Sequence, residues 1–124
     1  LTDMAWHTIT EPFEGDVEQF EVASMAPTQV LPVVPGTAMA PAFGHIFSGG
    51  YAAGYYGYKW AEVLEADAFS LFKEKGIFNR EVSGSFRENI LSKGGTEHPM
   101  ELYVRFRGHK PETRALIEKM GLGK

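Results

Sequence analysis

The residues best suited to chemistry gather in one short stretch, residues 43–60, which reads FGHIFSGGYAAGYYGYKW. It holds five glycines, four tyrosines and one histidine, and its only formally charged residue is Lys59. A phenol O–H is a neutral donor, so it can face a developing oxyanion without first being desolvated as a charge. The composition therefore favours an uncharged polar surface on which tyrosines are the donors.

The spacing of the tyrosines predicts how they are presented. Tyr51, Tyr55 and Tyr58 stand at i, i+4 and i+7, which places three phenols along one face of a helix, whereas Tyr56 points elsewhere. A packed amphipathic face is the ordinary explanation for such spacing. The neighbouring glycines argue against it, because each one weakens a helix by up to about 1 kcal/mol relative to alanine.

Glycine has a clearer use in a loop that moves over a ligand or lets a bound chain approach its backbone closely. The glycines in question are Gly49, Gly50, Gly54 and Gly57. Together these residues predict a glycine-hinged, tyrosine-lined, uncharged binding wall with His45 at its mouth. They leave open what binds there.

The histidines do not predict a metal site. His7, His45, His98 and His109 include no pair at i, i+4 spacing, and the chain has neither an HExxH motif nor a cysteine. A zinc site made within this chain alone is therefore not expected. We expect His98 and His109 to be ordinary surface residues in helix connections, and His7 indicates no role.

Charge is distributed unevenly along the 124 residues. Residues 1–21 carry six acidic groups and no Lys or Arg, residues 22–58 carry no formal charge, and all twelve Lys and Arg lie in residues 59–124. The uncharged run is expected to be buried or to line a cavity. It is not a membrane span, because prolines interrupt it and it lacks ~18–20 consecutive apolar residues. The net charge of −4 gives no reason to expect nucleic acid as a partner.

Proline, glycine and capping residues predict an all-α fold, in a single helical fragment over residues 1–124. Residues 1–7 are expected to be the end of a helix. Asp16 is expected to cap a short helix that Pro27 ends, and residues 27–44 are expected to be irregular because of their prolines. The chain begins at Leu1, and we expect it to be part of a longer polypeptide.

One long central helix is predicted from about Tyr51 to Lys75, ended by Gly76. Its apolar stripe at helical spacing consists of Trp60, Ala61, Leu64, Ala68, Leu71 and Phe72.

Shorter helices are predicted to follow. Asn79 is expected to cap a helix whose apolar face ends around Gly94, and that face consists of Val82, Phe86 and Ile90. Two more helices are expected from Pro99 to Gly108 and from Pro111 to Gly121, because proline is typical of helix starts and glycine of helix ends.

Four segments, taken in order, resemble the C-terminal end of the zinc oligopeptidase family, which includes thimet oligopeptidase, oligopeptidase A and peptidyl-dipeptidase. They read LTDMAWH, FGHIFSGGYAAGYYGYKWAEVLEADAF, GIFNREVSGSFRENILSKGG and PMELYVRFRGHKP. The resemblance implies an almost entirely helical enzyme whose deep channel admits short peptides. It also implies zinc in the full-length enzyme, held by an HExxH motif and a later glutamate that lie upstream of this chain.

The resemblance assigns two catalytic positions. His45 matches a histidine that hydrogen-bonds the substrate backbone or the tetrahedral intermediate, and Tyr58 matches a tyrosine that donates to the oxyanion.

It also assigns the substrate contacts. Tyr51 and Tyr55 match tyrosines that contact substrate, and Gly49 and Gly50 lie in the substrate loop, about residues 43–58, that flexes over it. The preceding GTAMAPAF segment lacks an arginine and a tyrosine that many relatives have.

We therefore expect the C-terminal part of a zinc metallopeptidase of the peptidyl-dipeptidase or oligopeptidase A type, inactive by itself and cytoplasmic in its parent form. Its expected partners are short peptides and the rest of its own polypeptide, and the isolated chain is expected to self-associate. The alternative is a non-catalytic helical module that uses the tyrosines as a peptide-binding or packing surface.

Overall fold

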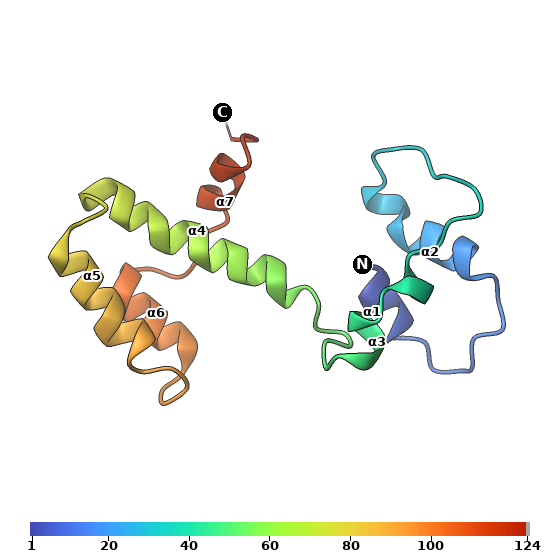
Figure 1. The fold of residues 1–124 in the computed structure, drawn as a ribbon, viewed down its shortest axis with the longest axis horizontal. Coiled ribbons are helices and arrows are strands. Elements are labelled where there is room, and N and C mark those ends of the chain that lie inside the picture. The colour runs from blue at the N-terminus through green and yellow to red at the C-terminus, as the bar shows by residue number, and fades with distance from the viewer. Residues whose placement is uncertain (124) are drawn as a thin grey trace. The chain divides into compact units, whose positions relative to one another are not determined.

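The computed structural model describes residues 1–123, and the chain forms two compact units, Leu1–Gly57 and Tyr58–Lys124. Helices and turns make up both units, and no strand occurs in residues 1–123 (Figure 1). The predicted all-α class is confirmed. None of the helices in this described part is long and apolar enough to cross a membrane.

Short helices joined by long loops make up the first unit. They are α1 (Thr2–Trp6), α2 (Val17–Met25), the 3₁₀ turns η1 (Ala26–Thr28) and η2 (Ala40–Ala42), and α3 (His45–Ser48). Ile46 of α3 is fully buried within this first unit. The rings of Trp6, Phe13 and Phe20 pack against one another, with centroids 4.2–5.0 Å apart. This aromatic cluster therefore joins α1 to α2.

The cap of α2 is the one predicted from sequence. The Asp16 side chain accepts the N–H of Gln19 at 2.8 Å, and the α-helix ends at Met25, just before Pro27. Residues 29–39 then run without regular structure, as their prolines predict.

Acidic side chains of α2 hold this irregular segment in place. Both carboxylate oxygens of Glu18 accept the N–H of Gly36 at 3.0 Å. The buried carboxylate of Glu21 accepts the N–H groups of Met39, at 2.7 Å, and Ala40. Main-chain N–H groups of the uncharged run thus solvate two carboxylates from the acidic first 21 residues.

The second unit is built on the long helix α4 (Gly57–Lys75). After it come α5 (Arg80–Phe86), a π-helical turn η3 (Arg87–Leu91), α6 (Pro99–Arg107) and α7 (Arg114–Lys119). Ala68 of α4, Val82 of α5, and Tyr103 and Phe106 of α6 form its main core. A smaller cluster joins Val63 and Ala66 of α4 to Leu116 of α7.

Two details of the long helix differ from the prediction. It begins at Gly57 instead of Tyr51, because Ala53, inside the predicted helix, adopts a positive φ angle of 54° that a right-handed α-helix cannot contain. Its predicted end is correct, since Gly76 takes φ 102° directly after Lys75.

The predicted apolar stripe of α4 is correct from Leu64 onward and wrong at its first two residues. Trp60 is 45% exposed and Ala61 is also exposed, whereas Val63 and Ala66 are buried in their place. The physical reason is α7, whose Leu116 packs on the Val63 side of the helix. Position along the sequence gives no sign of that contact.

The helices after α4 follow their local signals closely. The Asn79 side chain accepts the N–H groups of Glu81 and Val82, and the predicted face of Val82, Phe86 and Ile90 packs on the main core. Gly108 ends α6 as predicted, and it takes the left-handed conformation with φ 87°. Neither the π-helical turn nor the late start of α7 at Arg114 was predicted.

Candidate functional site

The structure brings together three of the residues singled out from the sequence, all within the first unit. His45 opens α3, and Tyr51 and Tyr55 lie in the turn that follows this helix. The His45 ring lies 6.0 Å from the Tyr51 ring and 6.3 Å from the Tyr55 ring, and the two tyrosine rings are 6.3 Å apart. We call these three residues the His–Tyr cluster.

Aromatic contacts set the orientation of the cluster. Phe43 packs edge-on against Tyr55, with ring centroids 4.7 Å apart, and the Tyr51 and Tyr55 rings meet at 81°. Edge-to-face arrangements of this kind are the favoured ones for aromatic pairs. Since His45 is exposed and Tyr51 is 38% exposed, a ligand can reach the cluster.

A tight turn, rather than a helix, brings the two tyrosines together. Gly54 donates its N–H to the carbonyl of Tyr51 at 2.8 Å, and Gly57 donates to Gly54 at 3.0 Å. The predicted continuous helical face of Tyr51, Tyr55 and Tyr58 is therefore wrong. Tyr58 lies instead in the first turn of α4, half exposed, in the second unit.

Two glycines have definable local roles in this turn. A Cβ on Gly49 would stand 3.4 Å from the Tyr51 ring, at the close end of ordinary van der Waals contact, so the Tyr51 ring lies next to the Gly49 backbone. Gly50 has open space around it, but its φ of 75° favours glycine. These observations explain the local geometry, and the assignment of Gly49 and Gly50 to substrate binding stays a prediction.

Sequence reasoning missed Asp3, which belongs to the surroundings of the cluster. Its Oδ1 accepts the N–H of Ala53 and its Oδ2 accepts the N–H of Tyr55, both at 2.9 Å. The His7 Nδ1 lies 2.9 Å from Asp3 Oδ1. The i, i+4 spacing of Asp3 and His7 was the available signal for this contact.

The pKa of Asp3 reflects two opposing influences. Burial acts to raise it, but the N–H groups of Tyr55 and Ala53 and the neighbouring His7 outweigh burial, so the pKa lies below the ordinary value of 3.8. Asp3 is therefore a carboxylate at neutral pH, and it holds the turn as a charged acceptor.

The remaining histidines have local partners. Nδ1 of His98 caps α6 by accepting the N–H of Met100 at 3.2 Å, and Nδ1 of His109 lies 2.7 Å from the carbonyl of Lys110. Within residues 1–123, no three His, Asp or Glu side chains are grouped so that they could hold a metal ion.

Comparison with known proteins identifies the family of the chain. The model of a family described as peptidase family M3 matches residues 1–122. The chain belongs to peptidase family M3. This is a family of zinc metallopeptidases, so the resemblance to the zinc oligopeptidases is confirmed.

Relatives with three different names show the range of similar proteins. The chain is 63% identical over 123 residues to oligopeptidase A of Escherichia coli (strain K12), covering 98% of this chain and 18% of that protein. It is 41% identical over 124 residues to dipeptidyl carboxypeptidase of the same organism, again covering 98% of this chain and 18% of the relative. A thimet-like oligopeptidase of Dictyostelium discoideum is 36% identical over 87 residues, with 70% of this chain and 13% of the relative covered. The chain thus spans about a fifth of the length of the first two relatives.

Proposed function

We propose that residues 1–124 are the C-terminal part of the catalytic domain of a zinc peptidase that hydrolyses short peptides, of the oligopeptidase A or peptidyl-dipeptidase type. The observation that carries the proposal is the His–Tyr cluster, in which an imidazole and two phenols lie within 6.3 Å of one another on an accessible surface. Membership of peptidase family M3 supports peptides as the ligand class.

The proposed role of the cluster is to bind and orient the peptide. Phenol O–H groups of Tyr51 and Tyr55 donate to peptide carbonyls, and His45 hydrogen-bonds the peptide backbone. Gly49 and Gly50 leave the loop without side chains, so an extended peptide can approach its main chain. None of these residues carries a formal charge that binding would have to desolvate, apart from His45 when it is protonated.

Tyr58 has a separate proposed role, as donor to the oxyanion that develops on the scissile carbonyl. A neutral phenol fits this role, because a positioned donor stabilises the developing charge without carrying one of its own. Tyr58 is half exposed in the first turn of α4.

The described residues do not fit a zinc site, since they group no three suitable ligands. We therefore propose that the zinc ligands of the parent lie outside this chain, and we derive no step of the reaction through the metal. We propose that zinc is bound by the full-length parent enzyme. For that parent we propose a cytoplasmic location.

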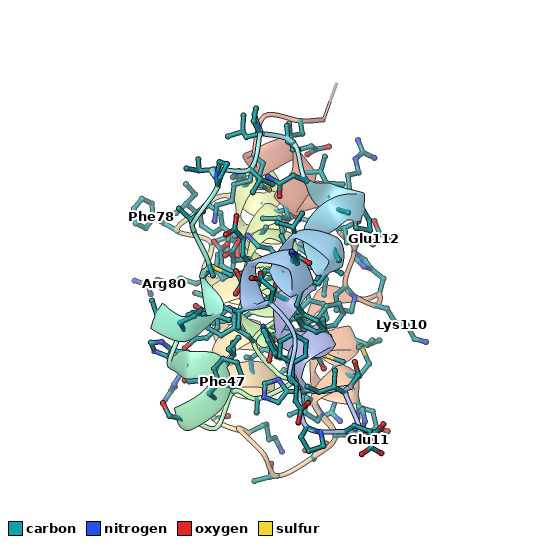
Figure 2. All side chains as sticks on the ribbon, turned by 90° about the vertical axis from the view of Figure 1, so that its right-hand side faces the viewer. Glu11, Phe47, Phe78, Arg80, Lys110 and Glu112 are labelled. Carbon is teal, nitrogen blue, oxygen red and sulfur yellow. The ribbon has the colours of Figure 1, made fainter. Side chains whose placement is uncertain are left out.

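The rest of the parent polypeptide is the proposed partner of the second unit. An apolar groove of about 390 Å³ runs over α4, α5 and α6, lined in part by Leu64, Phe69, Phe72, Phe86 and Ile90. Phe78 between α4 and α5 is 95% exposed and points away from the ribbon (Figure 2). Because the chain spans 18% of the length of its two Escherichia coli relatives, we propose that other parts of the parent cover these surfaces.

The test of the proposed function is Tyr58→Phe in the full-length enzyme, with Tyr56→Phe as the matched control. Loss of one oxyanion donor is expected to lower kcat about 10²–10³-fold with zinc content unchanged. Tyr56, which is 68% exposed, is expected to be replaceable without effect. Wild-type turnover in Tyr58→Phe would contradict the oxyanion role and favour the alternative of a helical peptide-binding or packing module.

A further inference from the structure

Asp3 connects two segments that lie about fifty residues apart in sequence. From α1, its two carboxylate oxygens accept the main-chain N–H groups of Ala53 and Tyr55, each at 2.9 Å, across sequence separations of 50 and 52 residues. A carboxylate that accepts two main-chain N–H groups forms charge-assisted hydrogen bonds, which are shorter and stronger than neutral ones. The turn that carries Tyr55 is therefore anchored to α1.

The anchored turn contains a conformation that needs outside support. Ala53 takes φ 54°, in the left-handed region that is unfavourable for a residue with a Cβ. Such a conformation persists where surrounding contacts determine it. The two bonds from Asp3 fall on Ala53 itself and on the residue two positions later, so they act directly on the strained part of the turn.

His7 completes the surroundings of the carboxylate. Its Nδ1 lies 2.9 Å from Asp3 Oδ1 and 2.7 Å from the carbonyl oxygen of Asp3. Both oxygens only accept hydrogen bonds, so Nδ1 must carry the proton. The His7 ring in turn lies 5.6 Å from the ring of Phe47 on α3, the helix that His45 opens. Asp3 on α1 and His7 directly after it therefore contact both elements that form the His–Tyr cluster.

We propose that Asp3, supported by His7, is a positioning residue for peptide binding: it fixes the main chain at residues 53–55 and so sets the Tyr51 and Tyr55 rings against His45. The inference rests on the proposed function of the His–Tyr cluster. Asp3 itself does not contact substrate. It acts through the backbone of Tyr55, whose ring meets both other members of the cluster.

Asp3→Asn in the full-length enzyme is the direct test. The two N–H groups face different oxygens of Asp3, and asparagine replaces one of these oxygens with a donor NH₂, so one N–H group loses its acceptor. The substitution also removes the carboxylate charge beside His7. We expect KM for a short peptide to rise about tenfold, as follows from small misplacement of binding groups, with zinc content unchanged. Hydrogen exchange of the amides of residues 53–57 is expected to accelerate in the same variant.

Asp16→Asn is the matched control, because it makes the same chemical change in the same unit at a helix N-cap, where Asn and Asp are equivalent. Asp16→Asn is expected to leave both KM and the hydrogen exchange of residues 53–57 unchanged. Asp3→Glu keeps the charge and both acceptor oxygens, and it is expected to recover exchange protection and KM more fully than Asn does. This recovery separates positioning from a general loss of folding.

A double-mutant cycle separates this inference from the proposed function. If Asp3 acts through the tyrosines, Asp3→Asn raises KM less in a Tyr51→Phe/Tyr55→Phe background than in the wild type. Wild-type KM in Asp3→Asn, combined with raised KM in the tyrosine variant, would overturn the positioning role alone. Wild-type KM in the tyrosine variant would overturn the proposed function of the cluster, and the role of Asp3 with it. Unchanged exchange in Asp3→Asn would show that Asp3 does not hold the turn.

Discussion

The hydroxyl of Tyr103 on α6 donates to Asp67 Oδ2 on α4 at 2.6 Å, within the core of the second unit. Asp67 is 3% exposed, and Arg107 adds a bond from its Nε to the Asp67 carbonyl at 3.0 Å. Burial and the hydrogen bond to Asp67 raise the pKa of Tyr103 above its ordinary value, so the hydroxyl remains a donor. A polar cluster thus joins the two longest packed helices of this unit in an otherwise apolar core.

Tyr103→Phe removes the donor and keeps the ring. A buried carboxylate that loses a hydrogen-bond partner costs about 1–3 kcal/mol, so we expect the enzyme to be destabilised by that amount in chemical denaturation. Tyr56→Phe is the matched control, because Tyr56 is 68% exposed. Equal denaturation midpoints in the two variants would show that the Asp67 bond contributes nothing.

Gly50→Ala and Gly57→Ala are expected to have opposite effects on stability. Neither glycine has an atom within 4 Å of an added Cβ, but Gly50 has φ 75° whereas Gly57 begins α4. Alanine at position 50 is expected to cost roughly 1–2 kcal/mol of left-handed strain. Alanine at position 57 is expected to stabilise the helix by up to about 1 kcal/mol. Thermal or chemical denaturation of both variants measures the change in stability. A change of the same sign in both variants would contradict the expected opposite effects.

Acidification is expected to release the turn that Asp3 holds. The pKa of Asp3 is lowered in the folded chain, so its contribution to stability is fully present above the unfolded pKa of 3.8 and is lost as pH falls through the lower folded value. Exchange protection of the Ala53 and Tyr55 amides should therefore decline below about pH 3.8, faster than the pH dependence of exchange itself predicts. In Asp3→Asn the decline should be absent. A decline of the same size in that variant would assign the effect to another group.

The isolated 124-residue chain is expected to lack peptidase activity and to self-associate. Its described residues group no metal ligands, and its second unit exposes the apolar groove over α4, α5 and α6. Peptide hydrolysis assays with added zinc, together with sedimentation analysis, check both expectations. Hydrolysis by the isolated chain would contradict the proposal that the metal ligands lie elsewhere, and a monomer at high concentration would contradict the exposed packing surface.

Local signals in the sequence were enough to predict most helix ends. Asp16 and Asn79 cap the helices predicted for them, and Gly76 and Gly108 end theirs at positive φ. Helix capping depends on contacts between residues within about one helical turn of each other, so both partners can be identified from the local sequence. The face of Val82, Phe86 and Ile90 was predictable for the same reason.

The predictions failed where distant segments decide the outcome. Periodicity placed Tyr51 in a helix, but the backbone at Gly50 and Ala53 turns instead, and that turn is bonded to Asp3. The stripe on α4 was misplaced because Leu116 packs from α7.

By itself the sequence determined the helical class, most caps, the family and the residues that could form a peptide-binding surface. Only the tertiary structure decided that His45, Tyr51 and Tyr55 meet through a turn, and that Asp3 supports this turn from fifty residues away. The physical reason is that capping and helical periodicity are local. A carboxylate can satisfy any main-chain N–H that folding brings to it, so sequence spacing does not identify its partner.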